Sequence, residues 1–100
     1  MLMPPLESDI DPLLHSPIRL RVCAILEGLQ RCSFLELRTR IGVSDSVLSK
    51  HLSKLEVAGV VELNGRRGSG SGVVVSLTRE GRGRWRTYLV QLSEALAGDS

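Results

Sequence analysis

The chain has 100 residues, 42% of them hydrophobic and 24% charged, which is the composition of one soluble globular domain able to bury a core without metal or disulfide staples. The formal net charge is only +2, but residues 31–86 hold eleven Lys or Arg against five Asp or Glu, which suits a polyanionic partner. Zinc-binding cysteine spacing, a signal peptide and an apolar run of the roughly 18 residues that a membrane span requires are absent, so we expect a cytoplasmic protein without metal or another cofactor.

The first third of the sequence predicts a loose start and then one strong helix. Two consecutive prolines disfavour helix in residues 1–9, which we expect to be a flexible N-terminal segment. A short helix is expected in "IDPLLHS", and a longer one begins at Pro17 with Ser16 as its N-cap. Apolar residues then recur at helical spacing as far as Leu29.

Two short helices joined by the turn "IGVS" follow, which is the pattern of a helix-turn-helix. The first opens with Ser33 and carries Glu36 three residues later, a combination that predicts a capping box. Ser44 is placed to cap the second helix. The apolar stripe of the second helix is Leu48, Leu52 and Leu55.

The remaining sequence predicts a β-hairpin and a last helix. Residues 60–63 and 73–77 are β-rich runs on either side of the loop "NGRRGSGSG", and Thr78 can cap a helix whose start is weakened by two glycines. Residues 10–97 are therefore predicted to form one domain, mainly α with a small β-hairpin, in the order helix, helix, helix, strand, strand, helix. This order is that of a winged helix-turn-helix.

The second helix of the helix-turn-helix carries serines at exposed positions, although serine lowers helix propensity. Short hydroxyls such as those of Ser46 and Ser49 permit entry into a DNA major groove and can bond to base edges, while lysines reach phosphates or guanine edges. Arginines on a flexible hairpin tip can enter a narrow minor groove. The expected DNA-binding residues are Ser44, Ser46, Ser49, Lys50, Ser53, Lys54, Arg66 and Arg67.

In its motifs the sequence resembles the short winged-helix transcriptional regulators related to the MarR and ArsR groups. The segments that carry the resemblance are "SPIRLRVCAILEGL", "SFLELRTRIGVSDSVLSKHLSKLEVAGVVEL" and "VVVSLTREGRGRW", within residues 10–92. The resemblance implies a regulator that binds duplex DNA as a homodimer. It also implies that the third helix reads the DNA, that the wing contacts the minor groove or the backbone, and that the terminal helices form the dimer interface.

The last helix carries apolar residues at steps of four, three and four, which is a heptad-like stripe. The stripe is either intramolecular core or a dimer seam. We favour the seam, because a domain of this size would not cover so long a helix. The predicted dimer interface comprises Leu13, Leu14, Trp85, Leu89, Leu92 and Leu96.

From these features we expect a sequence-specific homodimeric repressor, nucleoid-associated when bound, whose two reading helices enter successive major grooves of a pseudo-palindromic operator. The alternative is a winged helix that binds protein and no DNA, which Asp45, Val47 and the mild net charge motivate. A redox switch through Cys23 or Cys32 is a third interpretation. No catalytic spacing is present, so we do not expect an enzyme, and no pattern indicates a small-molecule effector.

Two further features have two interpretations each. His51 lies beside the leucine stripe and is expected to pack half-buried, with a phosphate contact as the alternative. Arg79, Arg82 and Arg86 share one face of the last helix, which is either solvated or in contact with flanking DNA.

Overall fold

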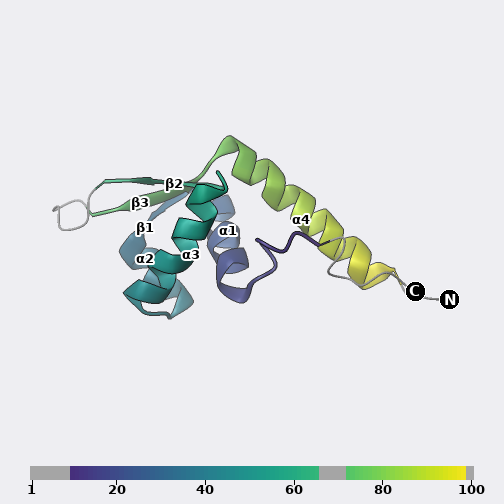
Figure 1. Cartoon of the computed structure of the whole chain (residues 1–100), viewed down its shortest axis with the longest axis horizontal. Helices are drawn as coiled ribbons and strands as arrows, with labels where there is room; N and C mark the ends of the chain where they lie inside the picture. Colours follow the sequence, from purple (N-terminus) through teal and green to yellow (C-terminus); the bar gives the residue numbers. More distant parts are fainter. Residues whose placement is uncertain (1–9, 66–71, 99–100) are drawn as a thin grey trace.

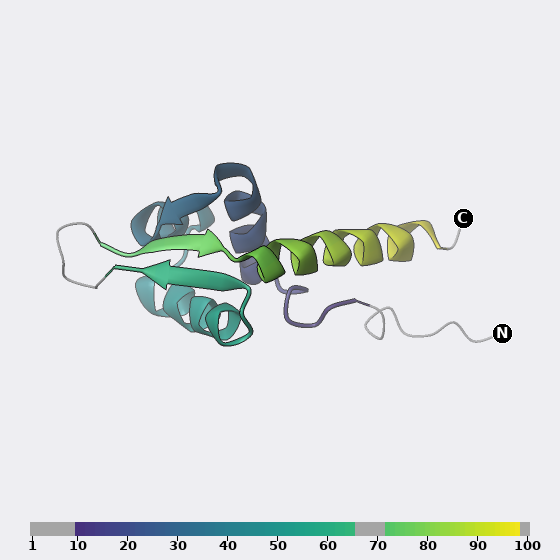
Figure 2. The ribbon, with the colours of Figure 1, turned by 90° about the horizontal axis from the view of Figure 1, so that it is seen from above.

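The computed structural model of the chain describes residues 10–65 and 72–98, which form four helices and a small antiparallel sheet (Figure 1). In chain order the elements are α1 (Pro17–Leu29), β1 (Arg31–Ser33), α2 (Phe34–Ile41), α3 (Asp45–Val57), β2 (Val61–Asn64), β3 (Val74–Leu77) and α4 (Arg79–Ala97). Helices α1, α2 and α3 lie on one side of the sheet, and α4 leaves it at the end opposite the hairpin loop (Figure 1, Figure 2). The predicted fold, a winged helix-turn-helix, is confirmed.

The sheet has three strands rather than the predicted two. β1 pairs antiparallel with one edge of β3, where Cys32 lies opposite Val75, and β2 pairs with the other edge, so the strand order is β1-β3-β2. β1 is only three residues long and was therefore too short to show an alternation of apolar residues. Its pairing with β3 ties the start of the helix-turn-helix to the wing.

Side-chain caps fix where three of the helices begin. The Ser33 Oγ accepts the Glu36 N–H at 3.0 Å, and the Ser44 Oγ accepts the Val47 N–H at 3.3 Å. Thr78 caps α4 in the same way. The predicted starts of α2, α3 and α4 are therefore confirmed.

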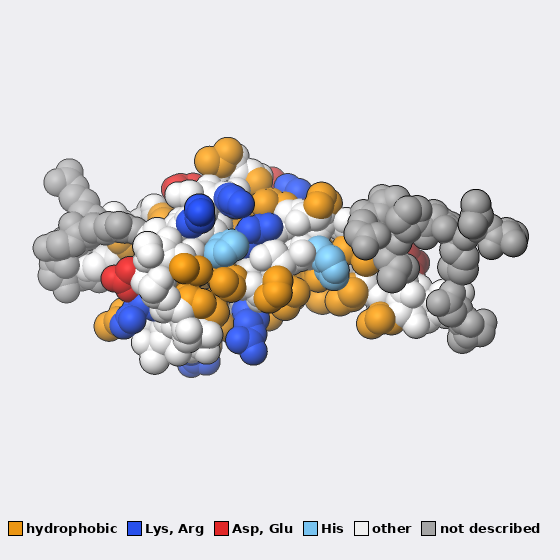
Figure 3. Space-filling model, turned by 60° about the horizontal axis from the view of Figure 1, so that its bottom comes forward, with side chains coloured by type: hydrophobic (Ala, Val, Ile, Leu, Met, Phe, Trp, Pro, Cys, Tyr) orange, Lys and Arg blue, Asp and Glu red, His pale blue; other side chains and the backbone are white. Residues whose placement is uncertain are grey.

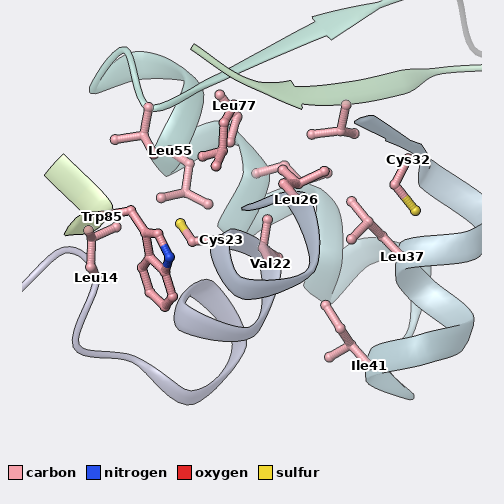
Figure 4. Close-up of a cluster of buried hydrophobic side chains, with 14 of the residues drawn as sticks. Leu14, Val22, Cys23, Leu26, Cys32, Leu37, Ile41, Leu55, Leu77 and Trp85 are labelled. Atoms are coloured by element: carbon pink, nitrogen blue, oxygen red, sulfur yellow. The ribbon is translucent and has the colours of Figure 1, made fainter. Parts of the chain in front are cut away.

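The core lies between the sheet and helices α1 to α3, and the start of α4 closes one end of it (Figure 4). Leu26, Leu37 and Leu55 come from three different helices and are fully buried. At the α4 end of the cluster Trp85 lies with Leu14 (Figure 4). Burying one leucine contributes roughly 1.5–3 kcal/mol, so these contacts hold the apolar side of α3 firmly in the body.

Residues 10–16 form turns, and the short helix predicted there is wrong. The Asp11 Oδ1 accepts the Leu13 N–H at 3.0 Å in an Asx turn, and the His15 N–H donates to the Asp11 carbonyl at 2.9 Å, so a single helical turn forms and is not continued. The segment is also held on α4, since the Arg84 Nη2 donates to the Asp11 Oδ1 at 3.0 Å and the Asp11 N–H donates to the Gln91 side chain at 2.9 Å. These contacts hold the single turn against α4.

Candidate nucleic-acid interface

Helix α3 has one buried and one exposed side. Its three predicted core leucines are fully buried. The opposite side presents Ser46, Lys50 and Ser53, at steps of four and three, and all three are exposed. A helix about 10–12 Å across with a hydroxyl-and-ammonium side of this kind has the size and the chemistry to enter a DNA major groove.

Ser49, a further predicted reading residue, turns towards the wing. It lines a small pocket between α3 and the hairpin together with Ser53, Phe34 and Leu63. Ser49 is half-buried, whereas Ser53 is exposed. The open side of α3 therefore carries Ser46, Lys50 and Ser53, the last of which also borders the pocket, while the half-buried Ser49 lies at the boundary between helix and wing.

A glycine and an ion pair fix the turn between α2 and α3. Gly42 has a φ of 82°, a left-handed conformation that glycine adopts without strain, and its N–H donates to the Arg38 carbonyl at 2.8 Å. Asp45, in the first turn of α3, lies 3.0 Å from the Arg38 Nε through its Oδ1. The Asp45 carboxylate therefore pairs with Arg38 of α2. Its presence supports the protein-binding alternative less than the sequence alone suggests.

His51 is half-buried, as predicted, and it contacts a residue that the sequence did not single out. The Arg19 Nη1 donates to the His51 Nδ1 at 2.8 Å, which joins α1 to α3. Nδ1 is thus the acceptor of a neutral imidazole, whose proton lies on Nε2. Burial, followed by the charges of Arg19, Lys54 and Lys50, lowers the pKa of His51 from its ordinary 6.5. No sequence period connects residues 19 and 51, so only the fold shows this contact.

The lowered pKa of His51 predicts a loss of stability in mildly acidic solution. The unfolded imidazole takes up its proton near pH 6.5, while the folded one stays neutral to lower pH. The free energy of unfolding should therefore fall as the pH decreases from 7.5 towards 5. Urea unfolding at several pH values measures this fall, and His51→Gln should reduce it. The same pH dependence in both proteins would assign the fall to another group.

The wing is the hairpin of β2 and β3, in which Val61 lies opposite Leu77. It extends past the helices at one end of the molecule (Figure 1). Residues 66–71 lie outside the described residues, and with them the predicted contacts Arg66 and Arg67. The hairpin is confirmed, and the role of its arginines stays a prediction.

The residues of the predicted dimer interface lie in different environments. Leu14 and Trp85 are buried, Leu13 and Leu92 are half-buried against the core, and Leu89 and Leu96 are exposed. The fractional exposures are 0% for Leu14, 5% for Trp85, 43% for Leu89 and 79% for Leu96. The apolar stripe therefore starts inside the body and continues on the part of α4 that projects beyond it (Figure 2).

Two of the three arginines considered on α4 turn towards α1. The Arg82 Nη1 and the Arg86 Nη2 lie 3.7 Å and 3.6 Å from carboxylate oxygens of Glu27. Arg79 is exposed. This arrangement differs from both sequence interpretations, since part of the basic face forms ion pairs between α4 and α1.

The two cysteines are free and buried. Burial raises the pKa of the Cys23 thiol to about 12, and burial also raises the pKa of Cys32. The thiolate is the reactive form of cysteine, so these environments disfavour a redox switch.

In residues 10–65 and 72–98, no group of three or more His, Cys, Asp or Glu side chains is placed to hold a metal ion. No helix in the same ranges combines the length and the apolar character needed to cross a membrane.

Comparison with known proteins places these features in a wider group. Residues 18–96 match the sequence model of a protein family, the winged helix DNA-binding domain. An uncharacterised protein of Methanocaldococcus jannaschii is 30% identical over 85 residues, which cover 80% of this chain and 88% of that protein.

Two solved structures show the same fold. A transcriptional regulator homologue from Pyrococcus horikoshii has a TM-score of 0.80 at 22% identity, over 86% of each chain. A MarR-family transcriptional regulator from Silicibacter pomeroyi has a TM-score of 0.70 at 23% identity, over 91% of this chain and 61% of that one.

Proposed function

Because the chain belongs to the winged helix DNA-binding domain family, we propose that it binds duplex DNA sequence-specifically as a homodimer and regulates transcription. The observation that carries the proposal is the two-sided helix α3. Its leucine side is buried in the body, while Ser46, Lys50 and Ser53 stand exposed on the other side. A major groove accepts such a helix and offers partners for both hydroxyl and ammonium groups.

The exposed groups of α3 divide into two roles. Lys50 and Lys54 supply affinity through phosphates or guanine edges, and Ser46 and Ser53 discriminate bases through short hydrogen bonds. The N-terminal amides of α3 beside Ser44 suit a backbone phosphate. The hairpin adds a contact beside the groove that α3 occupies.

A homodimer would place two copies of α3 on one face of the DNA. The exposed Leu89 and Leu96 support pairing through the projecting part of α4. Two reading helices about 34 Å apart would enter successive major grooves of a pseudo-palindromic site. A dimer seated on a promoter would exclude polymerase, and so we propose repression.

Selection from a random duplex library, followed by sequencing of the bound pool, tests this function. We expect enrichment of two inverted half-sites separated by about one helical turn. A pool without enrichment, and no retardation of duplex DNA even at low salt, would support the protein-binding alternative instead.

Lys54→Ala is expected to weaken binding to all duplexes alike. Removing one phosphate contact should also make the slope of log K against log salt shallower by about one unit. Fluorescence anisotropy across a salt series measures both quantities. Ser46→Ala is the contrast, since it should alter the preferred bases and leave the slope unchanged. An unchanged slope for Lys54→Ala would remove this lysine from the phosphate contacts.

A further inference from the structure

Arg19 of α1 lies against the reading helix in a fixed orientation. Its Nε donates to the Leu13 carbonyl at 2.6 Å and its Nη1 donates to the His51 Nδ1 at 2.8 Å. Both acceptors are neutral, so the guanidinium is held in place by groups that do not neutralise its charge. Among residues 10–65 and 72–98, no carboxylate pairs with Arg19, whereas Arg38, on the neighbouring helix, pairs with Asp45.

The positive charges around His51 come from two helices. Arg19 belongs to α1, while Lys50 and Lys54 belong to α3, and all three act electrostatically on the imidazole. Figure 3 shows Lys and Arg side chains gathered beside the histidine nearer the hairpin end of the molecule. Three cations that all act on one imidazole, with no acidic group of the described residues among the charges that act on it, are suited to an anion.

We propose that Arg19, oriented by Leu13 and His51, binds a backbone phosphate of duplex DNA beside Lys54. The inference rests on the proposed function and deepens it, because it makes α1 a second element of the DNA interface. The ligand of this site would be a phosphodiester of the DNA backbone. Duplex DNA bound to α3 would place such a group beside Arg19.

The geometry leaves donors available for the phosphate. A guanidinium has five N–H groups, and the two bonds to Leu13 and His51 use two of them. The acceptor role of Nδ1 leaves the proton of His51 on Nε2, which has no partner among the described residues and can donate to the same anion. Because Arg19 is already immobilised, binding a phosphate would cost little further side-chain entropy.

Arg19→Gln tests the inference against Arg21→Gln, a matched loss of charge on the same helix. Arg21 lies about 200° around α1 from Arg19 and lines a different groove, with Arg40 and Ile41. With the duplex enriched from the library, Arg19→Gln should bind about tenfold more weakly, with a salt slope shallower by about one unit. Arg21→Gln should match the wild type in both quantities.

The outcomes separate this inference from the proposed function. A wild-type protein that binds no duplex DNA would overturn the function itself. A wild-type protein that binds, with Arg19→Gln equal to Arg21→Gln, would overturn only the phosphate contact. Thermal unfolding of each variant is measured first, and binding is compared where all of them are folded.

Two further variants test the orientation of Arg19 and keep the inference open to refutation if Arg19→Gln does not fold. Arg19→Lys keeps the charge but cannot bond to Leu13 and His51 with a planar fork, so it should still bind several-fold more weakly. His51→Gln retains a side-chain acceptor for Arg19 and should bind better than His51→Leu. Wild-type affinity in both Arg19→Lys and His51→Leu would overturn the positioned contact.

Discussion

Replacing Gly81 with alanine is expected to lower the free energy of unfolding by about 3 kcal/mol, a large effect for one added methyl group. A Cβ on Gly81 would lie 2.0 Å from the carbonyl oxygen of Val60 and 2.7 Å from its carbonyl carbon. Both atoms belong to the backbone, so no side-chain rotation can relieve the overlap. The first turn of α4 would have to move away from the segment that follows α3.

The Val60 carbonyl is itself held in place. It accepts the Thr78 N–H at 3.0 Å and lies 3.2 Å from the Thr78 hydroxyl, which also accepts the Gly81 N–H at 2.8 Å. A shift of either segment would therefore break the N-cap of α4. Thermal unfolding followed by circular dichroism should show a melting temperature lower by roughly 12–24 °C.

Gly83→Ala is the matched control, two residues further along the same helix. A Cβ at Gly83 meets nothing within 4 Å. Alanine in a helix interior is favoured over glycine by about 1 kcal/mol, so this substitution should stabilise the protein. The two alanines are thus expected to act with opposite signs. Equal effects at both positions would contradict the close backbone contact at Gly81.

Helix propensity alone does not distinguish these two glycines. It predicts that both weaken the start of the last helix, because propensity depends only on the residue and its element. The difference between them comes from the Val60 carbonyl, which is 21 residues away in the chain. Caps such as Ser33 and Thr78 were predictable because the bonds they make span only three residues.

The open side of α3 could be predicted for a related reason. Helical periodicity places Ser46 and Lys50 opposite the leucine stripe, so burial of one side exposes the other. The contact between Arg19 and His51 joins two helices and could not be predicted from either. The stripe on α4 was recognised by its period, but a period does not tell how much of a helix the rest of the chain covers.

Converting Leu89 and Leu96 together to glutamate is expected to make the protein monomeric and to weaken its binding to a palindromic duplex by about 100-fold or more. Both leucines are exposed in the single chain, at 43% and 79%, so charges there should leave the core intact. In a dimer paired through the projecting part of α4 they would be buried, and unpaired carboxylates in such a seam are costly. The second half-site would then lose the high effective concentration that a dimer provides.

Val90→Glu provides the control for this experiment. Val90 is 56% exposed and lies about 100° around the helix from Leu89, away from the stripe. Analytical ultracentrifugation should find this variant dimeric and the double variant monomeric, with similar melting temperatures for both. Both should bind a duplex with one half-site equally well, because α3 is unchanged in each. A double variant that stays dimeric would show that the dimer interface does not include this stripe. A double variant that binds the single half-site more weakly would show that the substitutions affect α3 itself and not only dimerisation.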